Sequence, residues 1–303
     1  MIEFAFFIGC QTPARLTQYE SSARAVLNKL EVRLIDIREF NCCGYPLRNI
    51  EFKAFLLSSA RNLALAEKRE LNILTLCKCC YGTLKKADYL LKKYSHLRDE
   101  INQLLSKEGL RYEGNAEIKH FLSVLSKDIG IEKIKEMIVK NYRGLKIATH
   151  YGCHALRPSE IVGFDNAVTP SIFDQLVEVT GAESIDWQMK LECCGAPVFG
   201  VNDELSMDLM QKKLRSGKEA EGEYLCVACP YCHIQFDKVQ KRILSQKGLN
   251  NPLPSILYTQ LLGLSLGIDG RSLGLEMNEI PIAPIESSLY AIRIEGENKD
   301  ESK

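Results

Sequence analysis

Short apolar runs alternate with amphipathic stretches along the first 80 residues of the chain. The runs at residues 3–8, 32–37 and 71–76 are rich in branched and aromatic side chains, so they predict buried strands. The stretches at 15–30 and 51–69 place apolar residues at helical spacing, so they predict amphipathic helices. Strands that alternate with helices in this way predict a parallel α/β unit with right-handed crossovers.

A second alternation of the same kind begins near residue 145, after a long amphipathic region. That region predicts a helical connection made of four segments, at 83–93, 97–107, 121–128 and 131–140. The break at Asn141–Gly144 ends the connection. Further strands and helices are then predicted at 145–149, 173–179, 184–187, 203–221 and 223–227.

The predicted fold class is therefore α/β, with two duplicated, Rossmann-like parallel α/β domains related by pseudo-twofold symmetry and joined by the helical connection. We expect the first domain at residues 1–142 and the second at 143–285. Residues 286–303 carry mixed charge and predict a C-terminal tail. A chain of 303 residues has the length expected of two domains of about 150 residues each.

Charge and hydropathy narrow the classes of partner. Lys plus Arg equal Asp plus Glu at 39 each, so no overall field favours nucleic acid or an acidic membrane surface. No apolar run approaches the roughly 20 residues of a membrane helix. The first ten residues have no basic start, so they do not resemble a signal peptide. We expect a cytoplasmic protein without membrane insertion and without a nucleic-acid partner.

Ten of the twelve cysteines form two sets that follow the same order along the chain. Corresponding cysteines are separated by 143, 151, 151, 152 and 152 residues, which indicates an internal duplication. The first set is Cys10, Cys42, Cys43, Cys77 and Cys80, and the second is Cys153, Cys193, Cys194, Cys229 and Cys232.

The spacing within each set favours a soft, many-centred metal group. A glycine follows each adjacent pair, as Gly44 and Gly195, and positive φ there would let both sulfurs converge. Each C-x-x-C pair follows a predicted strand and opens a helix, where free N–H groups stabilise thiolates. Five cysteines exceed the four of a tetrahedral zinc site, so iron–sulfur ligation is favoured, and structural zinc stays an alternative.

These motifs bring the sequence close to a known family. The order Cys, Cys-Cys-Gly, Cys-x-x-Cys occurs twice and resembles the CCG domain. Residues 80–85 and 229–237 are similar to the corresponding segments of the B subunit of soluble heterodisulfide reductase. The likeness covers Phe4 to Gly267. It implies a noncubane 4Fe-4S cluster on each cysteine set, with the disulfide of coenzyme M and coenzyme B (CoM-S-S-CoB) cleaved to two thiols between them.

Neither half contains the run C-x2-C-x2-C-x3-C-P of a bacterial ferredoxin, so the electrons must come from another protein. The resemblance implies which partners supply them. Electrons are then expected from a ferredoxin-like iron–sulfur subunit and a flavin subunit of the same complex, with a hydrogenase or a formate dehydrogenase as further candidates. Cleaving a disulfide takes two electrons, and two clusters could bind one sulfur and supply one electron each.

Two histidines and two extra cysteines complete the candidate site. His154 follows Cys153 and is the candidate proton donor, with a hydrogen bond to a cluster sulfur or to backbone as its structural alternative. We expect His233 to be structural. The extras Cys79 and Cys226 are expected to be buried thiols.

Two other functions stay open at this point. CCG domains also occur in subunits that act on another disulfide, on fumarate or succinate, or on lactate or glycolate, where this chain would transfer electrons. A structural scaffold with zinc, in one or both halves, is the non-enzymatic alternative.

Overall fold

Two four-stranded parallel sheets with the same strand order form the framework of the chain. The computed structural model describes residues 2–247 and 251–292. The strand order is β2-β1-β3-β4 in the first sheet and β7-β6-β8-β9 in the second. Every pairing within these two sheets is parallel. The predicted duplication of a parallel α/β unit is therefore confirmed.

The first half begins at the central strand of its sheet. Its elements are β1 (Ile2–Phe7), α1 (Gln11–Arg15), α2 (Thr17–Lys29), β2 (Val32–Ile35), η1 (Tyr45–Leu47), α3 (Phe52–Glu67), β3 (Ile73–Thr75), α4 (Lys78–Lys93), α5 (Ser95–Leu105), η2 (Ser106–Glu108), β4 (Ile118–His120), α6 (Phe121–Ser123), the π-helix η3 (Val124–Gly130), α7 (Ile131–Met137) and β5 (Lys140–Tyr142).

The second half repeats this order of strands. Its elements are β6 (Lys146–His150), α8 (Cys153–Leu156), α9 (Ser159–Val162), α10 (Ile172–Glu178), β7 (Glu183–Ile185), η4 (Ala196–Val198), α11 (Asp203–Glu219), β8 (Tyr224–Val227), α12 (Pro230–Ile234), the π-helix η5 (Gln235–Val239), α13 (Gln240–Lys247), β9 (Ser255–Leu257), α14 (Tyr258–Ser265), η6 (Leu275–Met277), η7 (Ala283–Ser288) and β10 (Leu289–Ala291).

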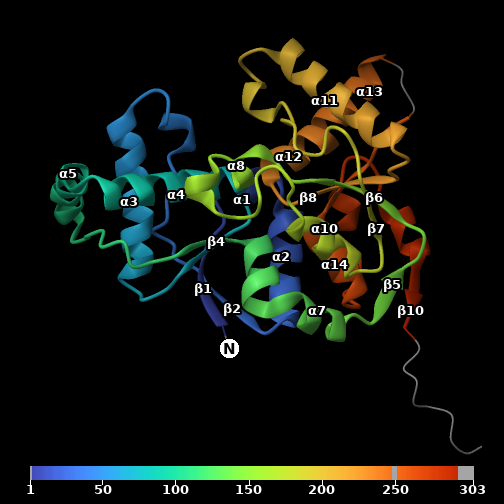
Figure 1. Ribbon diagram of the computed structural model, residues 1–303, viewed down its shortest axis with the longest axis horizontal. Helices are drawn as coiled ribbons and strands as arrows, with labels where there is room; N and C mark the ends of the chain where they lie inside the picture. The colour runs from blue at the N-terminus through green and yellow to red at the C-terminus, as the bar shows by residue number, and fades with distance from the viewer. Residues whose placement is uncertain (1, 248–250, 293–303) are drawn as a thin grey trace, which may run out of the picture.

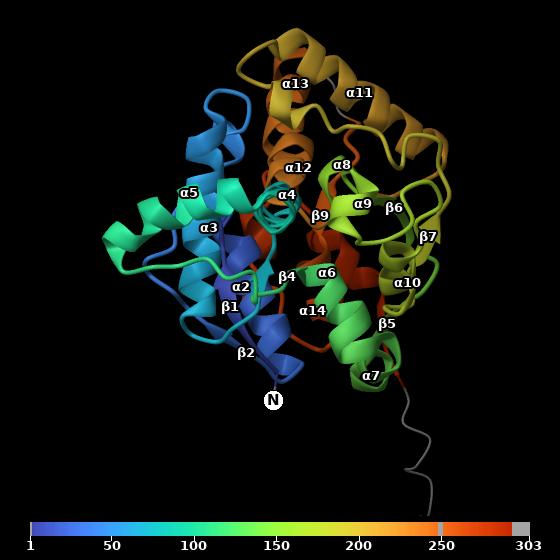
Figure 2. The same cartoon turned by 60° about the vertical axis from the view of Figure 1, so that its left-hand side comes forward.

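Each half packs the helical segment after its fourth strand against the other half. α14 of the second half packs against α2 of the first, and the two lie side by side in Figures 1 and 2. Ser22 and Thr259 share a buried hydrogen bond of 2.6 Å at this contact. In return, α6 and η3 of the first half pack against α10 of the second. The exchange is reciprocal, as twofold-related units require.

The strands β5 and β10 reinforce the same symmetry. They pair with each other in an antiparallel ladder, with Tyr142 opposite Leu289 and Lys140 opposite Ala291. β10 lies within the predicted tail, of which residues 293–303 are outside the described part. The domain bounds at 142 and 285 stay a prediction. The structure shows in addition that β5 and β10, which lie close to these two bounds, pair with each other.

Several predicted elements have different bounds. β4 and β9 were not predicted, because neither lies in an extended apolar run like the one at 71–76 that predicted the equally short β3. β4 lies inside the predicted helical connection. The helix predicted from residue 83 begins at Lys78, so the first C-x-x-C motif is its opening turn. In the described residues, no helix combines the length and the apolar character needed to cross a membrane.

Candidate metal centre

The cysteines of each set gather at the carboxyl edge of their sheet. Cys10 and Cys77 lie a few residues beyond the ends of β1 and β3, and Cys153 and Cys229 lie in the same way beyond β6 and β8. The adjacent pairs come from the loops after β2 and β7. Ligand sites of open parallel sheets lie at this edge. The duplication thus produces two cysteine sites rather than one.

The two sites meet in a continuous row of thiols. Every cysteine except Cys77 and Cys226 has a cysteine neighbour whose side chain influences its pKa, and Cys77 is itself such a neighbour. The spatial order is Cys10, Cys42, Cys43, Cys80, Cys77, Cys79, Cys229, Cys232, Cys194, Cys193, Cys153. The sulfur of Cys232 lies 3.6 Å from that of Cys194. The sulfurs of Cys77, Cys79 and Cys229 lie within 4.8 Å of one another, although Cys229 belongs to the second half.

The two Cys-Cys-Gly turns have the conformation that the sequence predicted. Gly44 has φ 88° and Gly195 has φ 85°, both in the region that favours glycine. A Cβ at Gly44 would lie 3.0 Å from the carbonyl oxygen of Phe55, and one at Gly195 would lie 2.5 Å from that of Ser206. Both turns therefore pack directly on the helix that follows, and only glycine fits.

A second pair of glycines brings the backbone close to the sulfurs. Gly9 and Gly152 precede Cys10 and Cys153, with φ of 74° and 72°. A Cβ at Gly9 would lie 3.0 Å from the sulfur of Cys80, and one at Gly152 would lie 3.7 Å from that of Cys232. Each set is thus bordered by bare backbone, which leaves room for a bulky group between the thiols.

In each set, the first cysteine of the adjacent pair has a lowered pKa, and in the second set hydrogen bonds outweigh burial to lower the pKa of Cys229 as well. The hydrogen bond from Cys10 lowers the pKa of Cys42 to about 2, and the bond from Cys153 lowers the pKa of Cys193 to about 2. The backbone N–H of Gly195 also donates to the sulfur of Cys193, at 3.4 Å. Hydrogen bonds to the charged form stabilise it, so both sets favour a thiolate at equivalent positions.

The two extra cysteines are buried, as expected, but their surroundings differ. Cys226 is a fully buried residue of β8. Cys79 is 3% exposed and lies between the two sets, next to Cys77 and Cys229. The spacing of cysteines along the chain could not show that Cys79 lies at the site and Cys226 does not. Only the packing of the two halves brings Cys229 to Cys79.

His154 lies where the two cysteine sets meet. Its Nδ1 is 3.5 Å from the sulfur of Cys79 and 3.6 Å from that of Cys153. Its ring contacts Tyr45 edge to face, with 5.2 Å between centroids. Burial lowers the pKa of His154, and nearby Cys229 acts in the opposite direction. A Cβ at Gly82 would lie 2.8 Å from the His154 carbonyl oxygen, so the glycine lets α4 approach α8.

The sequence analysis missed a second histidine at the site. His150 ends β6 and is fully buried, with Nε2 3.2 Å from the sulfur of Cys232. Burial lowers its pKa well below the usual value, so the imidazole is neutral. Its counterpart at the end of β1 is Phe7. Comparing these two strand ends in the repeat would have singled out His150. His233 is buried, with Nδ1 3.1 Å from Ser255 Oγ, which agrees with a structural role.

Two buried lysines were also missed. Lys213 donates to the carbonyl oxygens of Met189 and Glu192, and Lys78 to those of Tyr151 and His150. Burial lowers the pKa of Lys213 to about 8 and lowers that of Lys78 as well, while neighbouring cysteines act to raise both. Each lysine is therefore held by backbone carbonyls beside the second set.

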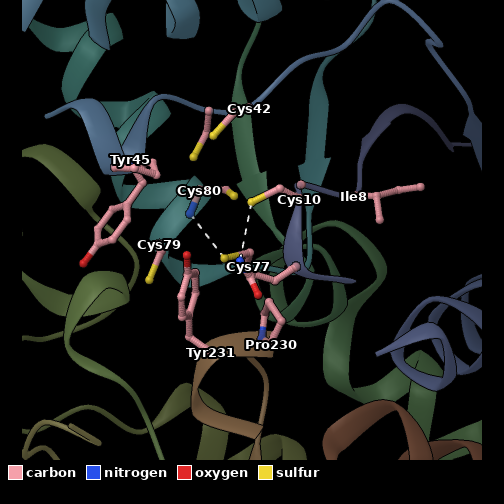
Figure 3. Close-up of a pocket in the computed structure, with 13 residues that line it drawn as sticks. Ile8, Cys10, Cys42, Tyr45, Cys77, Cys79, Cys80, Pro230 and Tyr231 are labelled. Atoms are coloured by element: carbon pink, nitrogen blue, oxygen red, sulfur yellow. Dashed lines mark hydrogen bonds between the residues drawn. The ribbon is translucent and has the colours of Figure 1, made fainter. Parts of the chain in front are cut away.

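A small pocket opens at the first set. Cys10, Cys42 and Cys79 line it together with Tyr45. Figure 3 shows Pro230 and Tyr231 of the second half facing the same pocket. Residues of both halves thus surround the first set.

The donor set fits soft metal chemistry. Thiolates bind iron–sulfur clusters and zinc, and sulfur predominates here over carboxylate, which harder ions prefer. Five thiols at each edge, with glycine backbone on one side, fit a cluster better than a four-coordinate ion. The trio His150, Cys194 and Cys232, whose ligand atoms lie within 4.8 Å, shows that a nitrogen ligand is also within reach of the second set.

The repeated unit belongs to a known domain family. The cysteine-rich domain named CCG matches residues 4–85 and 147–237, one copy in each half.

Curated proteins match nearly the whole chain. The B subunit of the ferredoxin/F420H2-dependent CoB-CoM heterodisulfide reductase of Methanosarcina acetivorans is 35% identical over 96% of this chain and 98% of its own length. The 8-methylmenaquinol:fumarate reductase membrane anchor subunit of Wolinella succinogenes is 32% identical over 92% of this chain and 97% of its own length.

A solved structure shares the fold. A hypothetical protein from Helicobacter pylori superposes with a TM-score of 0.74 at 17% sequence identity, over 92% of this chain and 52% of that protein. At this identity the likeness concerns the fold alone.

Proposed function

This chain belongs to the tandem CCG-domain family that includes the B subunit of heterodisulfide reductase, and from that premise we propose that it is the catalytic subunit of a heterodisulfide reductase. The reaction converts one disulfide, two electrons and two protons into two thiols, with CoM-S-S-CoB as substrate. The observation that carries the proposal is the pair of equivalent cysteine sets that meet in one row of thiols.

We assign one noncubane 4Fe-4S cluster to each set. Cys10, Cys42, Cys43, Cys77 and Cys80 would hold the first, and Cys153, Cys193, Cys194, Cys229 and Cys232 the second. Such clusters supply single electrons and soft iron sites for sulfur. The protein contributes the spacing of the two sets and a buried surrounding, since most of these thiols are shielded from water.

His154 is our candidate for the proton donor. Its ring lies within 3.6 Å of sulfurs from both halves, so a leaving thiolate held between the sets would be close to it. An anionic sulfur there would favour the protonated imidazole, against the effect of burial. The electrons would come from a ferredoxin-like iron–sulfur subunit and a flavin subunit, with a hydrogenase or a formate dehydrogenase as the ultimate donor.

A second candidate function has its own support. The 32% identity to a subunit of a menaquinol:fumarate reductase favours electron transfer within another oxidoreductase. In that case, the same two sets would relay electrons and no disulfide would bind.

The test measures iron, sulfide and zinc in anaerobically purified protein, with spectra before and after addition of CoM-S-S-CoB. We expect about eight irons per chain and a paramagnetic signal that appears with the disulfide. Full iron content without any response to the disulfide would favour the electron-transfer function. About four irons with one zinc would make the first set structural, and colourless zinc protein would make the chain a scaffold.

A further inference from the structure

The two cysteine sets differ in the charge buried beside them. Among residues 2–247 and 251–292, Lys78 and Lys213 are the two lysine or arginine side chains that are buried, with exposed fractions of 2% and 0%. Both lie at the second set, although Lys78 belongs to the first half of the sequence.

Lys213 is fixed to the loop that carries the adjacent cysteines of the second set. It extends from α11, and its Nζ donates to the carbonyl oxygens of Met189 and of Glu192, the latter at 3.0 Å. Nζ also lies 4.7 Å from the centre of the Trp187 ring. Since Glu192 directly precedes Cys193, this charge has a fixed position next to the pair.

Lys78 is fixed to the other loop of the second set. Its Nζ donates to the carbonyl oxygens of Tyr151 and His150, and lies 4.9 Å from the centre of the Phe173 ring. A Cβ at Gly152 would lie 3.2 Å from Cδ of Lys78 and 3.7 Å from the sulfur of Cys232. The lysine chain thus runs past the second set on its way to the carbonyls.

The equivalent positions at the first set are neutral. Asn62 takes the place of Lys213 on α3 and donates its amide to the carbonyl oxygen of Cys42, at 3.1 Å. Pro230 takes the place of Lys78 in the second C-x-x-C motif and lines the first-set pocket. Arg24 and Arg38 border a groove open to solvent near Cys10, and Arg24 is paired with Glu20 and Asp36.

We propose that Lys78 and Lys213 hold the reduction potential of the second cysteine set's centre above that of the first set's centre. The proposal rests on the proposed function, because it requires a redox centre in each set. Reduction adds negative charge, which a fixed cation stabilises, and the effect is strong where water is excluded. An electron that enters the pair would therefore settle at the second set.

The first experiment uses the unmodified, anaerobically purified chain. Its two centres are titrated by spectroelectrochemistry with paramagnetic resonance, and the signals are assigned with Cys43→Ser and Cys194→Ser, which each disable one set. We expect two midpoint potentials, the higher one assigned to the second set. Two iron–sulfur centres with equal potentials, or with the reverse order, would overturn the inference and leave the proposed function standing.

The second experiment removes each charge in turn. Lys213→Met and Lys78→Met should each lower the reduced-to-oxidised ratio of the second centre about tenfold at a fixed potential, equal to about 59 mV for one electron. The first centre should keep its potential. Lys213→Arg, which keeps the charge, should retain the higher value.

Lys85→Met is the matched control, because Lys85 is on the same helix as Lys78 and lies instead over Tyr81, 5.9 Å from the ring centre. It should shift neither centre. Equal shifts of both centres in the Lys213 and Lys78 variants would contradict the inference. A wild-type chain with fewer than two redox-active centres would instead overturn the proposed function, and the inference with it.

Discussion

The two halves share their sheet order and their cysteine spacing, but they surround the cysteines differently. At the first set, the equivalent residues are Phe7, Gln11 and Asn62, which carry no charge. At the second set they are His150, His154 and Lys213. A duplicated scaffold thus keeps its cysteines in both copies, while the histidines and the lysine beside them occur in one copy only. The difference teaches that the scaffold and the reactivity of each site are specified by separate residues.

The largest expected effect is the loss of one set without the other. Cys43→Ser and Cys194→Ser replace equivalent buried cysteines, which we propose as ligands. Each should reduce the affinity of its own set for a cluster by at least about 100-fold. Iron analysis should find about half of the wild-type content in each variant, and disulfide reduction should be absent in both. Complete loss of iron from either variant would show that the sets load as one unit.

His154→Gln tests the difference in proton supply, with Gln11→Ala as the control at the equivalent position of the first half. Removing a general acid costs about 10²–10⁴-fold in turnover, and we expect this loss in the His154 variant alone. The wild-type rate should fall as pH rises through the pKa of His154, because the donor must be protonated. Since burial lowers this pKa, the fall should lie at acidic pH. An unchanged pH profile in the variant would exclude His154.

A buried histidine should also make the first sheet sensitive to acid. His120 ends β4, where its Nε2 lies 3.3 Å from the carbonyl oxygen of Leu76 and its Nδ1 accepts from the N–H of Leu122. Leu257 ends β9 at the equivalent place. Burial lowers the pKa of His120 to about 3, so the folded state binds fewer protons than the unfolded chain below pH 6.5.

The stability contributed by His120 is complete above pH 6.5 and is lost as pH falls towards 3. We expect this histidine to account for about 2 kcal/mol of the stability lost between pH 7 and pH 5. His120→Asn keeps a helix-capping side chain, and it should remove this part of the stability loss between pH 7 and pH 5. Urea unfolding of the metal-free, reduced chain at both pH values measures it. If the variant lost as much stability between pH 7 and pH 5 as the wild type, the acid sensitivity would have to come from other residues.

A smaller effect is expected at Gly9, where backbone strain and contact with a sulfur can be distinguished by comparison with Gly144. Gly9→Ala and Gly144→Ala both place a side chain at positive φ, which costs about 1–2 kcal/mol. A Cβ at Gly144 has nothing within 4 Å, whereas one at Gly9 meets the sulfur of Cys80. Both variants should therefore lose similar thermal stability as metal-free protein, but only Gly9→Ala should lose iron from the first set. Equal iron content in the two would refute the role of Gly9.

The repeat itself was readable from sequence because cysteine spacing and apolar runs are local signals. Gly44 and Gly195 could be assigned positive φ in advance, since two adjacent cysteines cannot otherwise converge. β4 and β9 were not predicted, because no extended apolar run marks them in the way that residues 71–76 mark β3. Their place is set by parallel pairing with β3 and β8, which is a tertiary effect.

Contacts between the halves were the part that sequence reasoning could not reach. Cys79 meets Cys229, and Lys78 reaches the carbonyl of Tyr151, across distances of many residues along the chain. Nothing in the local pattern distinguishes Lys78 from the many exposed lysines. Only its direction at the first turn of α4, towards the opposite half, makes it part of the site.

The reciprocal packing of α14 on α2 and of α6 on α10 carries a consequence for how far the two halves can differ. A half-length unit with this fold would leave those helices without a partner unless two copies exchanged them. In such a dimer, every substitution would appear at both sites. A single chain with two halves is free of that constraint, so a lysine or histidine can be present on one side only.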